Sequence, residues 1–176
     1  MPHPSRTPPS DAEFTALVHG SWGALYRTAY LLVGDHALAE DLVQTALAKT
    51  YASWHRVREL DAAPGYARTV LINTATSWFR RKSWRNERPS GDLPEPGYEP
   101  DHSDRPAILD ALGRLPARQR AVVVLRYYED LSVAQAAAAL GCSEGTVKSQ
   151  TSDALARLRT LLGAGVASHA LGAHHE

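Results

Sequence analysis

The sequence predicts an all-α protein built from two small helical domains joined by a flexible linker. Apolar residues recur at intervals of three and four, and no segment alternates with a period of two over a convincing length. A stretch rich in proline and poor in aliphatic residues separates the two helical regions and cannot form a core. We therefore expect domains at residues 10–85 and 105–163, a linker at 86–104 and a disordered tail at 164–176.

The first helix should begin at Ser10, because Glu13 stands three residues later, which is the spacing of a capping box. Gly34 can end this helix, since glycine adopts the left-handed conformation of a helix C-terminus without strain. Asp35 follows directly and can cap a second helix. The residues expected on or near one face of that helix are Leu38, Leu42, Leu47, Tyr51 and Trp54.

A third helix should begin near Pro64, because proline is tolerated in a first helical turn, and it should continue until Pro89 is near. The segment HRVRELDAAPG before it is expected to be a loop. The end of this helix is basic, with five Lys or Arg residues against one Glu over residues 78–90. Residues 91–110 reverse the balance, with one Arg against six acidic residues. The net charge of zero therefore hides a concentrated basic patch.

The second domain should hold four helices, of which the last two matter most. RPAILDALGRL predicts a short helix, and PARQRAVVVLRYYED predicts a second helix with Pro116 at its start. Ser132 and Gln135 form another capping box before SVAQAAAAL, Gly141 can end that helix, and Ser143 can cap the last one. Two helices separated by Gly-Cys-Ser predict a helix-turn-helix, a motif that places its second helix in the major groove of DNA.

The last helix divides into two faces. The stripe expected to be buried consists of Val147, Thr151, Ala154, Leu155, Leu158 and Leu162. The face expected to be exposed consists of Gly145, Thr146, Ser149, Ser152, Asp153 and Ala156, with Lys148, Gln150, Arg157 and Arg159 at its margins.

Composition excludes several classes of protein. No run approaches the ~18 apolar residues of a membrane-spanning helix, and prolines occupy the start, where a signal peptide has an apolar stretch. We therefore expect a cytoplasmic protein without membrane insertion. Cys142 is the single cysteine, which excludes an internal disulfide and a thiolate zinc site. The sequence has no Gly-rich phosphate loop, His-Glu metal pair or nucleophile motif, so we expect no enzyme activity, cofactor, metal or small-molecule substrate.

Three motifs together resemble a known family. GDHALAEDLVQTALAKTYASW and YARTVLINTATSWFRR are similar to regions 2.2 and 2.3 to 2.4 of sigma-70 family sigma factors. LPARQRAVVVLRYYEDLSVAQAAAALGCSEGTVKSQTSDALARLR is similar to region 4. The short form, without regions 1 and 3, resembles the extracytoplasmic-function group (group IV), and within it the actinobacterial type. The resemblance implies a protein that binds core RNA polymerase and promoter DNA, melts the DNA, and is held inactive by an anti-sigma factor.

The resemblance also implies roles for individual residues. Asp41 and Gln44 lie on one face of the second helix and match family positions that bind core polymerase. The residues that match −10 element contacts are Asn73, Arg80, Arg81, Lys82, Trp84 and Arg85, which combine cations for phosphates with an aromatic ring for bases. The loop VRELDAAPG would hold a base extruded from the duplex. The residues that match −35 element contacts are Ser143, Glu144, Thr146, Lys148, Ser149 and Ser152.

Other interpretations of these features remain open at this stage. A helix-turn-helix regulator that does not bind polymerase would need a phosphoacceptor or ligand domain with strands before the linker, and no such pattern is present. Trp54 and Trp78 are expected in the core, and Cys142 is either a packed turn residue or a redox-sensitive thiol. The histidines of the tail, His169, His174 and His175, belong either to a disordered segment or to an adventitious metal site.

Overall fold

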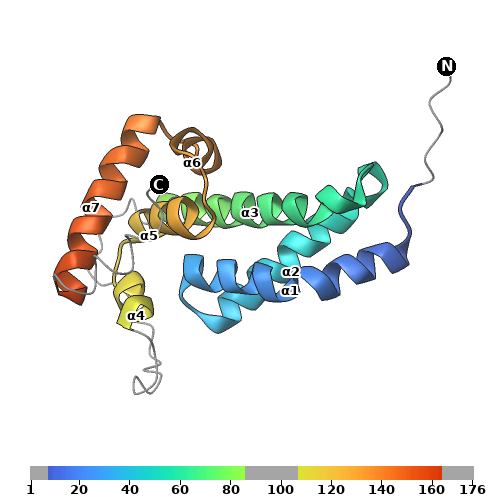
Figure 1. Cartoon of the computed structure of the whole chain (residues 1–176), viewed down its shortest axis with the longest axis horizontal. Coiled ribbons are helices and arrows are strands. Elements are labelled where there is room, and N and C mark those ends of the chain that lie inside the picture. The colour runs from blue at the N-terminus through green and yellow to red at the C-terminus, as the bar shows by residue number, and fades with distance from the viewer. Residues whose placement is uncertain (1–7, 86–106, 164–176) are drawn as a thin grey trace. The chain divides into compact units, whose positions relative to one another are not determined.

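The computed structural model describes residues 8–85 and 107–163, without the side chains of residues 82–85 (Figure 1). All regular structure in these two ranges is helical, which confirms the all-α class. Contacts between Cα atoms divide the chain into two compact units, Met1–Thr76 and Ser77–Glu176, each described by itself below. The expected linker at 86–104 and the tail with His169, His174 and His175 lie outside the described residues.

The first unit is built from α1 (Asp11–Val33), α2 (His36–Ala52) and the first part of α3 (Ala63–Arg85). The capping box is confirmed: the Glu13 carboxylate accepts from the Ser10 backbone N at 2.7 Å, and the Ser10 hydroxyl accepts from the Glu13 backbone N at 3.3 Å. Gly34 ends α1 in the left-handed region at φ 73°, and the Asp35 side chain caps α2. Each cap signal in the sequence therefore acts where it was expected.

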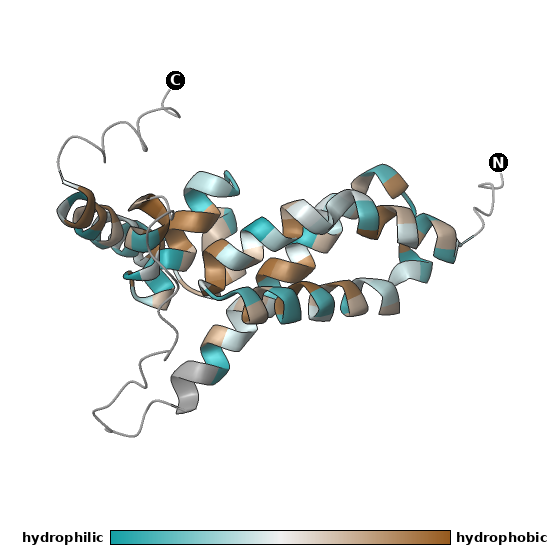
Figure 2. Cartoon of the chain, turned by 90° about the horizontal axis from the view of Figure 1, so that it is seen from below, coloured by the Kyte–Doolittle hydropathy of each residue, from teal (hydrophilic) through white to brown (hydrophobic). Residues whose placement is uncertain are grey.

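The core of this unit lies where α1, α2 and α3 pack together. Its fully buried side chains include Ala29 and Leu32 of α1, Leu42 and Val43 of α2, and Leu71 of α3. Hydrophobic and hydrophilic residues are interspersed along the helices, as expected of helices that bury one face (Figure 2). A polar contact joins two of the helices, because Lys49 Nζ donates to Thr74 Oγ1 at 3.2 Å.

Two expectations for the end of α2 were wrong. Trp54 does not belong to the face of α2, because that helix ends at Ala52 and Trp54 begins a separate 3₁₀ turn, η1 (Trp54–Arg56). The segment expected to be a loop contains this turn and a second one, η2 (Leu60–Ala62). Along α2 itself Leu42 and Leu47 are buried, whereas Leu38 and Tyr51 remain 47% and 48% exposed. Trp54 is nevertheless buried as expected, and Trp78 is half-buried.

The second unit contains α4 (Ala107–Gly113), α5 (Ala117–Val123), the π-helix η4 (Val124–Tyr128), α6 (Val133–Leu140) and α7 (Glu144–Leu162). The capping box of Ser132 and Gln135 is confirmed, and Gly141 ends α6 at φ 63°. The Cys142 backbone N donates to Ala137 O at 3.0 Å, which ties the turn back to α6. The small Ala136 and Ala137 are buried where α6 packs against its neighbours, so the helix-turn-helix forms as predicted.

The single helix expected over PARQRAVVVLRYYED is wrong in its second half, because the chain widens into η4 at Val124. The Glu129 backbone N donates to Val124 O at 3.0 Å, and the Leu131 N donates to Leu125 O at 2.9 Å. Asp130 takes a positive φ of 55°, a conformation that aspartate tolerates better than most residues. The Arg126 side chain also donates to Leu131 O, so contacts beyond the helix end hold this wider turn in place.

Candidate functional site

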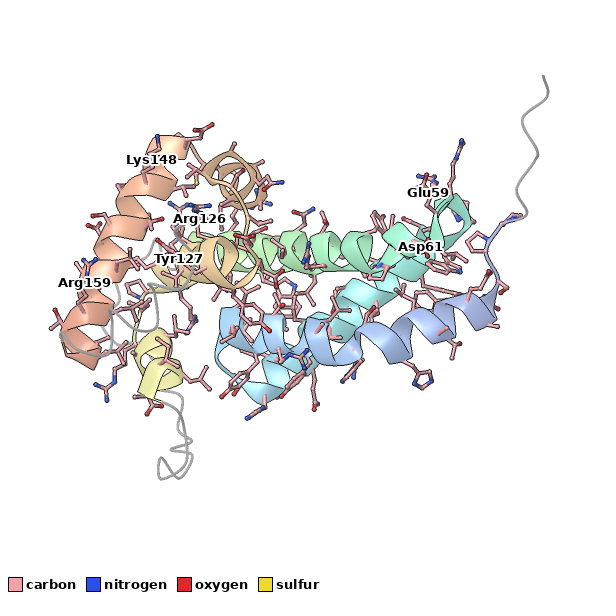
Figure 3. All side chains as sticks on the ribbon, in the orientation of Figure 1. Glu59, Asp61, Arg126, Tyr127, Lys148 and Arg159 are labelled. Carbon is pink, nitrogen blue, oxygen red and sulfur yellow. The ribbon has the colours of Figure 1, made fainter. Side chains whose placement is uncertain are left out.

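The start of α7 carries the residues expected to read DNA. The Ser143 hydroxyl accepts from the Thr146 backbone N at 3.1 Å and lies 2.9 Å from Thr146 Oγ1, so it caps the helix. The exposed side chains of this face include Glu144, Lys148, Ser149, Ser152 and Asp153, whereas Thr146 is half-buried rather than exposed. Figure 3 shows Lys148 near the start of α7 and Arg159 toward its other end. The N-terminal turns of α7 are thus open to a partner.

The opposite face of α7 anchors the helix. Val147, Ala154 and Leu158 are fully buried, and the other predicted stripe residues, Thr151, Leu155 and Leu162, are half-buried. The expected division of α7 into a packed face and an open face is therefore confirmed.

Hydrogen bonds within α7 limit which donors and acceptors its hydroxyl groups keep for contact with a DNA base. Ser149 Oγ donates to Thr146 O at 3.1 Å. A hydroxyl that donates to its own helix keeps its oxygen lone pairs as acceptors, so Ser149 can accept from a base amine without breaking that bond. Ser143 already uses its oxygen for the cap, which leaves it less free to serve a base.

On α2, Asp41 and Gln44 are both exposed on the side away from Leu42 and Val43. An aromatic group that sequence reasoning missed lies at the start of the same helix. Tyr26 Oη is 2.5 Å from His36 Nδ1, and the rings of Tyr30 and His36 stack at 4.5 Å between centroids. Burial raises the pKa of Tyr26, with a further contribution from the charge of Glu40.

On α3, an exposed stripe runs along the helix at intervals of seven residues through Tyr66, Asn73 and Arg80. Arg81 is exposed beside Arg80, and Trp78 and Phe79 are half-buried. The side chains of Lys82, Trp84 and Arg85 lie outside the description. Tyr66, which is 41% exposed, was missed as a candidate, although its spacing of seven from Asn73 was a usable signal.

The segment 55–62 links α2 to α3 and is mostly exposed: only Val57 among its residues is half-buried. Leu60 is 42% exposed, an unusual position for a leucine in a short connection. Glu59 and Asp61, labelled in Figure 3, are both exposed. The segment therefore presents both apolar and polar side chains to solvent.

Over residues 8–85 and 107–163, no three His, Cys, Asp or Glu side chains gather closely enough to hold a metal ion. In the same part of the chain, no helix combines the length and the apolar character needed to cross a bilayer.

A helix-turn-helix and a long helix with a basic, aromatic end together define a helical DNA-binding protein. Residues 21–85 match the family Sigma-70 region 2, and residues 105–158 match Sigma-70, region 4. The chain is 45% identical over 150 residues to the RNA polymerase sigma-E factor of Streptomyces coelicolor, with 84% of each chain covered. It is 36% identical over 149 residues to the ECF RNA polymerase sigma factor SigL of Mycobacterium tuberculosis, covering 78% of this chain and 82% of SigL.

A solved structure agrees with these matches. The sigma factor RpoE in complex with the anti-sigma factor NepR, from Bartonella quintana, superposes with a TM-score of 0.63 at 30% identity, over 87% of this chain and 98% of that one. The chain belongs to the extracytoplasmic-function group of the sigma-70 family: it is an RNA polymerase sigma factor. Sigma factors bind core RNA polymerase and promoter DNA and initiate transcription without being enzymes. The resemblance inferred from the three motifs is confirmed, and the regulator that does not bind polymerase is excluded by the region 2 match.

Proposed function

We propose that this sigma factor binds its partners through three exposed surfaces, each with a different partner. Asp41 and Gln44 of α2 bind core polymerase; α3 and the segment 55–62 bind the −10 element; the start of α7 binds the −35 element. One observation supports this division. The proposed contact residues with described side chains are exposed, except the half-buried Val57 and Thr146, and those on α2, α3 and α7 lie on helices whose other faces are buried.

The α2 surface suits a protein partner. A carboxylate and an amide three residues apart on one helical face can accept and donate side by side, which fits a polar or basic helix. Thr45, next to this pair, is half-buried and adds no charge to the surface.

The α3 surface suits DNA that has been opened. Arg80 and Arg81 supply cations for phosphates, in a region to which Lys82 and Arg85 add positive charge. Asn73 can pair with the edge of a base, and Trp84 provides a ring on which a base can stack. The segment 55–62 would receive a base that has left the duplex, as proteins that read extruded bases do.

The α7 surface carries little positive charge for a DNA reader. Lys148 is accompanied by Glu144 and Asp153 on the exposed face. A linked second DNA surface raises the effective concentration of α7 at the promoter, so this helix can select sequence while other contacts supply affinity. Asp153 repels phosphate and would favour a cytosine amine, which makes it a position where the −35 preference departs from that of sigma factors with a basic residue there.

We also propose that an anti-sigma factor regulates this protein in the cytoplasm, where polymerase and DNA are found. The support is the similarity to RpoE of Bartonella quintana, whose structure was solved with the anti-sigma factor NepR. Purification of the tagged protein from its own cells under non-inducing conditions should yield a second protein that blocks polymerase binding. Recovery of polymerase alone under those conditions would contradict this regulation.

The polymerase surface can be tested directly. Replacing Asp41 and Gln44 by alanine should weaken binding to core polymerase, measured by fluorescence anisotropy, by about tenfold or more for two lost polar contacts. Replacing His19 and Arg27, two exposed residues of α1, by alanine is the matched control and should leave affinity unchanged. Equal affinities for the Asp41/Gln44 variant and the unmodified protein, with both chains folded, would refute the assignment.

A further inference from the structure

A small apolar cluster lies apart from the main core of the first unit. Leu17, Trp54 and Ala63 form its buried part, and Phe14 and Val57 pack against them; these five residues are called the Trp54 cluster. Leu17 and Phe14 come from the first turns of α1. Trp54 precedes the segment 55–62, Val57 lies within it and Ala63 follows it. The exposed segment is therefore held at its start, its middle and its end by one cluster.

Ring contacts and hydrogen bonds tie this cluster to the beginning of α1. The Phe14 ring meets Trp54 edge-on, with centroids 5.2 Å apart and planes at 71°, and it also contacts Tyr51 at 4.8 Å. The Trp54 indole N–H donates to Ser10 O at 3.0 Å, and Tyr51 Oη donates to Asp11 Oδ1 at 3.0 Å. Both acceptors belong to the capped N-terminus of α1, whose backbone is fixed by the capping box.

The role of these bonds differs from that of ordinary core packing. The Trp54 side chain is 3% exposed, and its single donor, the indole N–H, bonds to the backbone carbonyl of Ser10, the N-cap residue of α1. This bond joins residues 44 positions apart in the sequence and fixes the indole ring directly before the segment 55–62. Ser10 O also accepts from the Phe14 backbone N at 3.1 Å. The carbonyl of this N-cap residue is therefore bonded both to the first turn of α1 and to Trp54, the residue before the segment.

We propose that the Trp54 cluster is a positioning element for promoter opening. It holds the segment 55–62 in the conformation that receives an extruded −10 base, so the first turns of α1 act on melting without touching DNA. The proposal rests on the proposed function of that segment. Trp54, Phe14 and Tyr51 are positioning residues, and the segment, with its exposed Leu60, makes the contact.

The test uses reconstituted holoenzyme and a duplex promoter with 2-aminopurine placed in turn at each base of the −10 element. Fluorescence of the extruded base reports opening, and binding at low temperature reports the closed complex. Trp54→Phe keeps a ring but removes the donor to Ser10 O, and Tyr51→Phe removes the donor to Asp11. Each should lower the closed-to-open equilibrium by about three- to tenfold, the effect of one hydrogen bond, without changing closed-complex affinity.

Two control variants separate positioning from general destabilisation. Tyr26→Phe removes a tyrosine hydroxyl paired with His36 toward the other end of α1 and should leave the opening equilibrium unchanged. Ala29→Gly weakens the buried centre of α1 and should lower the unfolding temperature without a specific opening defect. Equal opening defects in Ala29→Gly and Trp54→Phe would overturn the positioning role, since the effect would then follow stability alone.

Leu60→Ala separates this proposal from the one on which it rests. If Leu60→Ala lowers base extrusion while Trp54→Phe behaves as the unmodified protein, the segment contacts the base and the positioning role is wrong. If Leu60→Ala leaves extrusion unchanged at every labelled base, the segment does not receive the base, and both proposals fail. If Leu60→Ala and Trp54→Phe both lower promoter opening while Tyr26→Phe and Ala29→Gly leave it unchanged, the results support both the base-binding role of the segment and the positioning role of the Trp54 cluster.

Discussion

Ser143 is expected to contribute to promoter recognition mainly as the cap of α7. Its hydroxyl accepts from the Thr146 backbone N at 3.1 Å and lies 2.9 Å from Thr146 Oγ1. Ser143→Ala leaves that backbone donor without its partner, at a cost of about 1 kcal/mol, typical of a lost N-cap. Because the first turn of α7 must be ordered to enter a groove, the same free energy should appear as about fivefold weaker −35 binding.

Asparagine at position 143 provides the matched variant, because its side-chain oxygen caps helices as well as that of serine. Urea unfolding of the full chain should show the loss for Ser143→Ala and not for Ser143→Asn. Holoenzyme binding to a −35 duplex should follow the same order. An unchanged free energy of unfolding in Ser143→Ala, or an equal loss in both variants, would refute the role of the cap.

Three further predictions concern the turn, the exposed lysine and the cap of α1. Gly141→Ala should lower the free energy of unfolding by about 1–2 kcal/mol because Gly141 has φ 63°, whereas Gly113→Ala, which meets open space, should not; equal losses would contradict the argument. Lys148→Ala should weaken holoenzyme binding to the −35 element and reduce the slope of log affinity against log salt by about one if Lys148 contacts a phosphate; unchanged binding would remove Lys148 from the interface. Hydrogen bonds from Ser10 lower the pKa of the Glu13 carboxyl below its ordinary value of 4.5, so its stabilising effect is complete above that pH and is lost as the pH falls through the lowered pKa. Thermal unfolding between pH 7 and pH 3 should therefore show a steeper acid loss for the unmodified protein than for Glu13→Gln, and parallel curves would contradict it.

Helix ends were the part of the fold most open to prediction, because a cap depends on residues close together in sequence. Ser10 with Glu13, and Ser132 with Gln135, form reciprocal bonds over three residues, so the two signals need no knowledge of tertiary structure. Gly34 and Gly141 act in the same local way through their backbone conformation.

The π-helix η4 could not be predicted on these grounds. Its wider turn is held by bonds from Glu129 and Leu131 to Val124 and Leu125, and by Arg126 reaching to Leu131 O. A hydrophobic period of 3.6 residues fits VVVLRYY as well as any helix and carries no sign of those later contacts. The break between α2 and Trp54 was hidden for a similar reason, since the apolar spacing continues although the indole bonds to Ser10 at the start of α1.

Candidate contact residues were predictable where charge or helical position identified them. Lys148 was predictable as exposed because it lies at the margin of the polar face of its helix, whereas Asp41 was identified through the family positions that it matches. Tyr66 and the group of Tyr26, Tyr30 and His36 were missed because aromatic residues usually indicate a core. The spacing of seven residues between Tyr66 and Asn73 places both on one helix face, but the stacking of His36 on Tyr30 is shown only by the structure.

The central claim is that this sigma factor directs core polymerase to promoters through the surfaces on α2, α3 and α7. The most direct measurement sequences the 5′ ends of transcripts made in vitro on genomic DNA of its own organism, by core polymerase with and without the protein. We predict new start sites that share two upstream elements at a fixed spacing, and their loss in the Asp41/Gln44 double alanine variant. Identical start sites with and without the protein would contradict the claim.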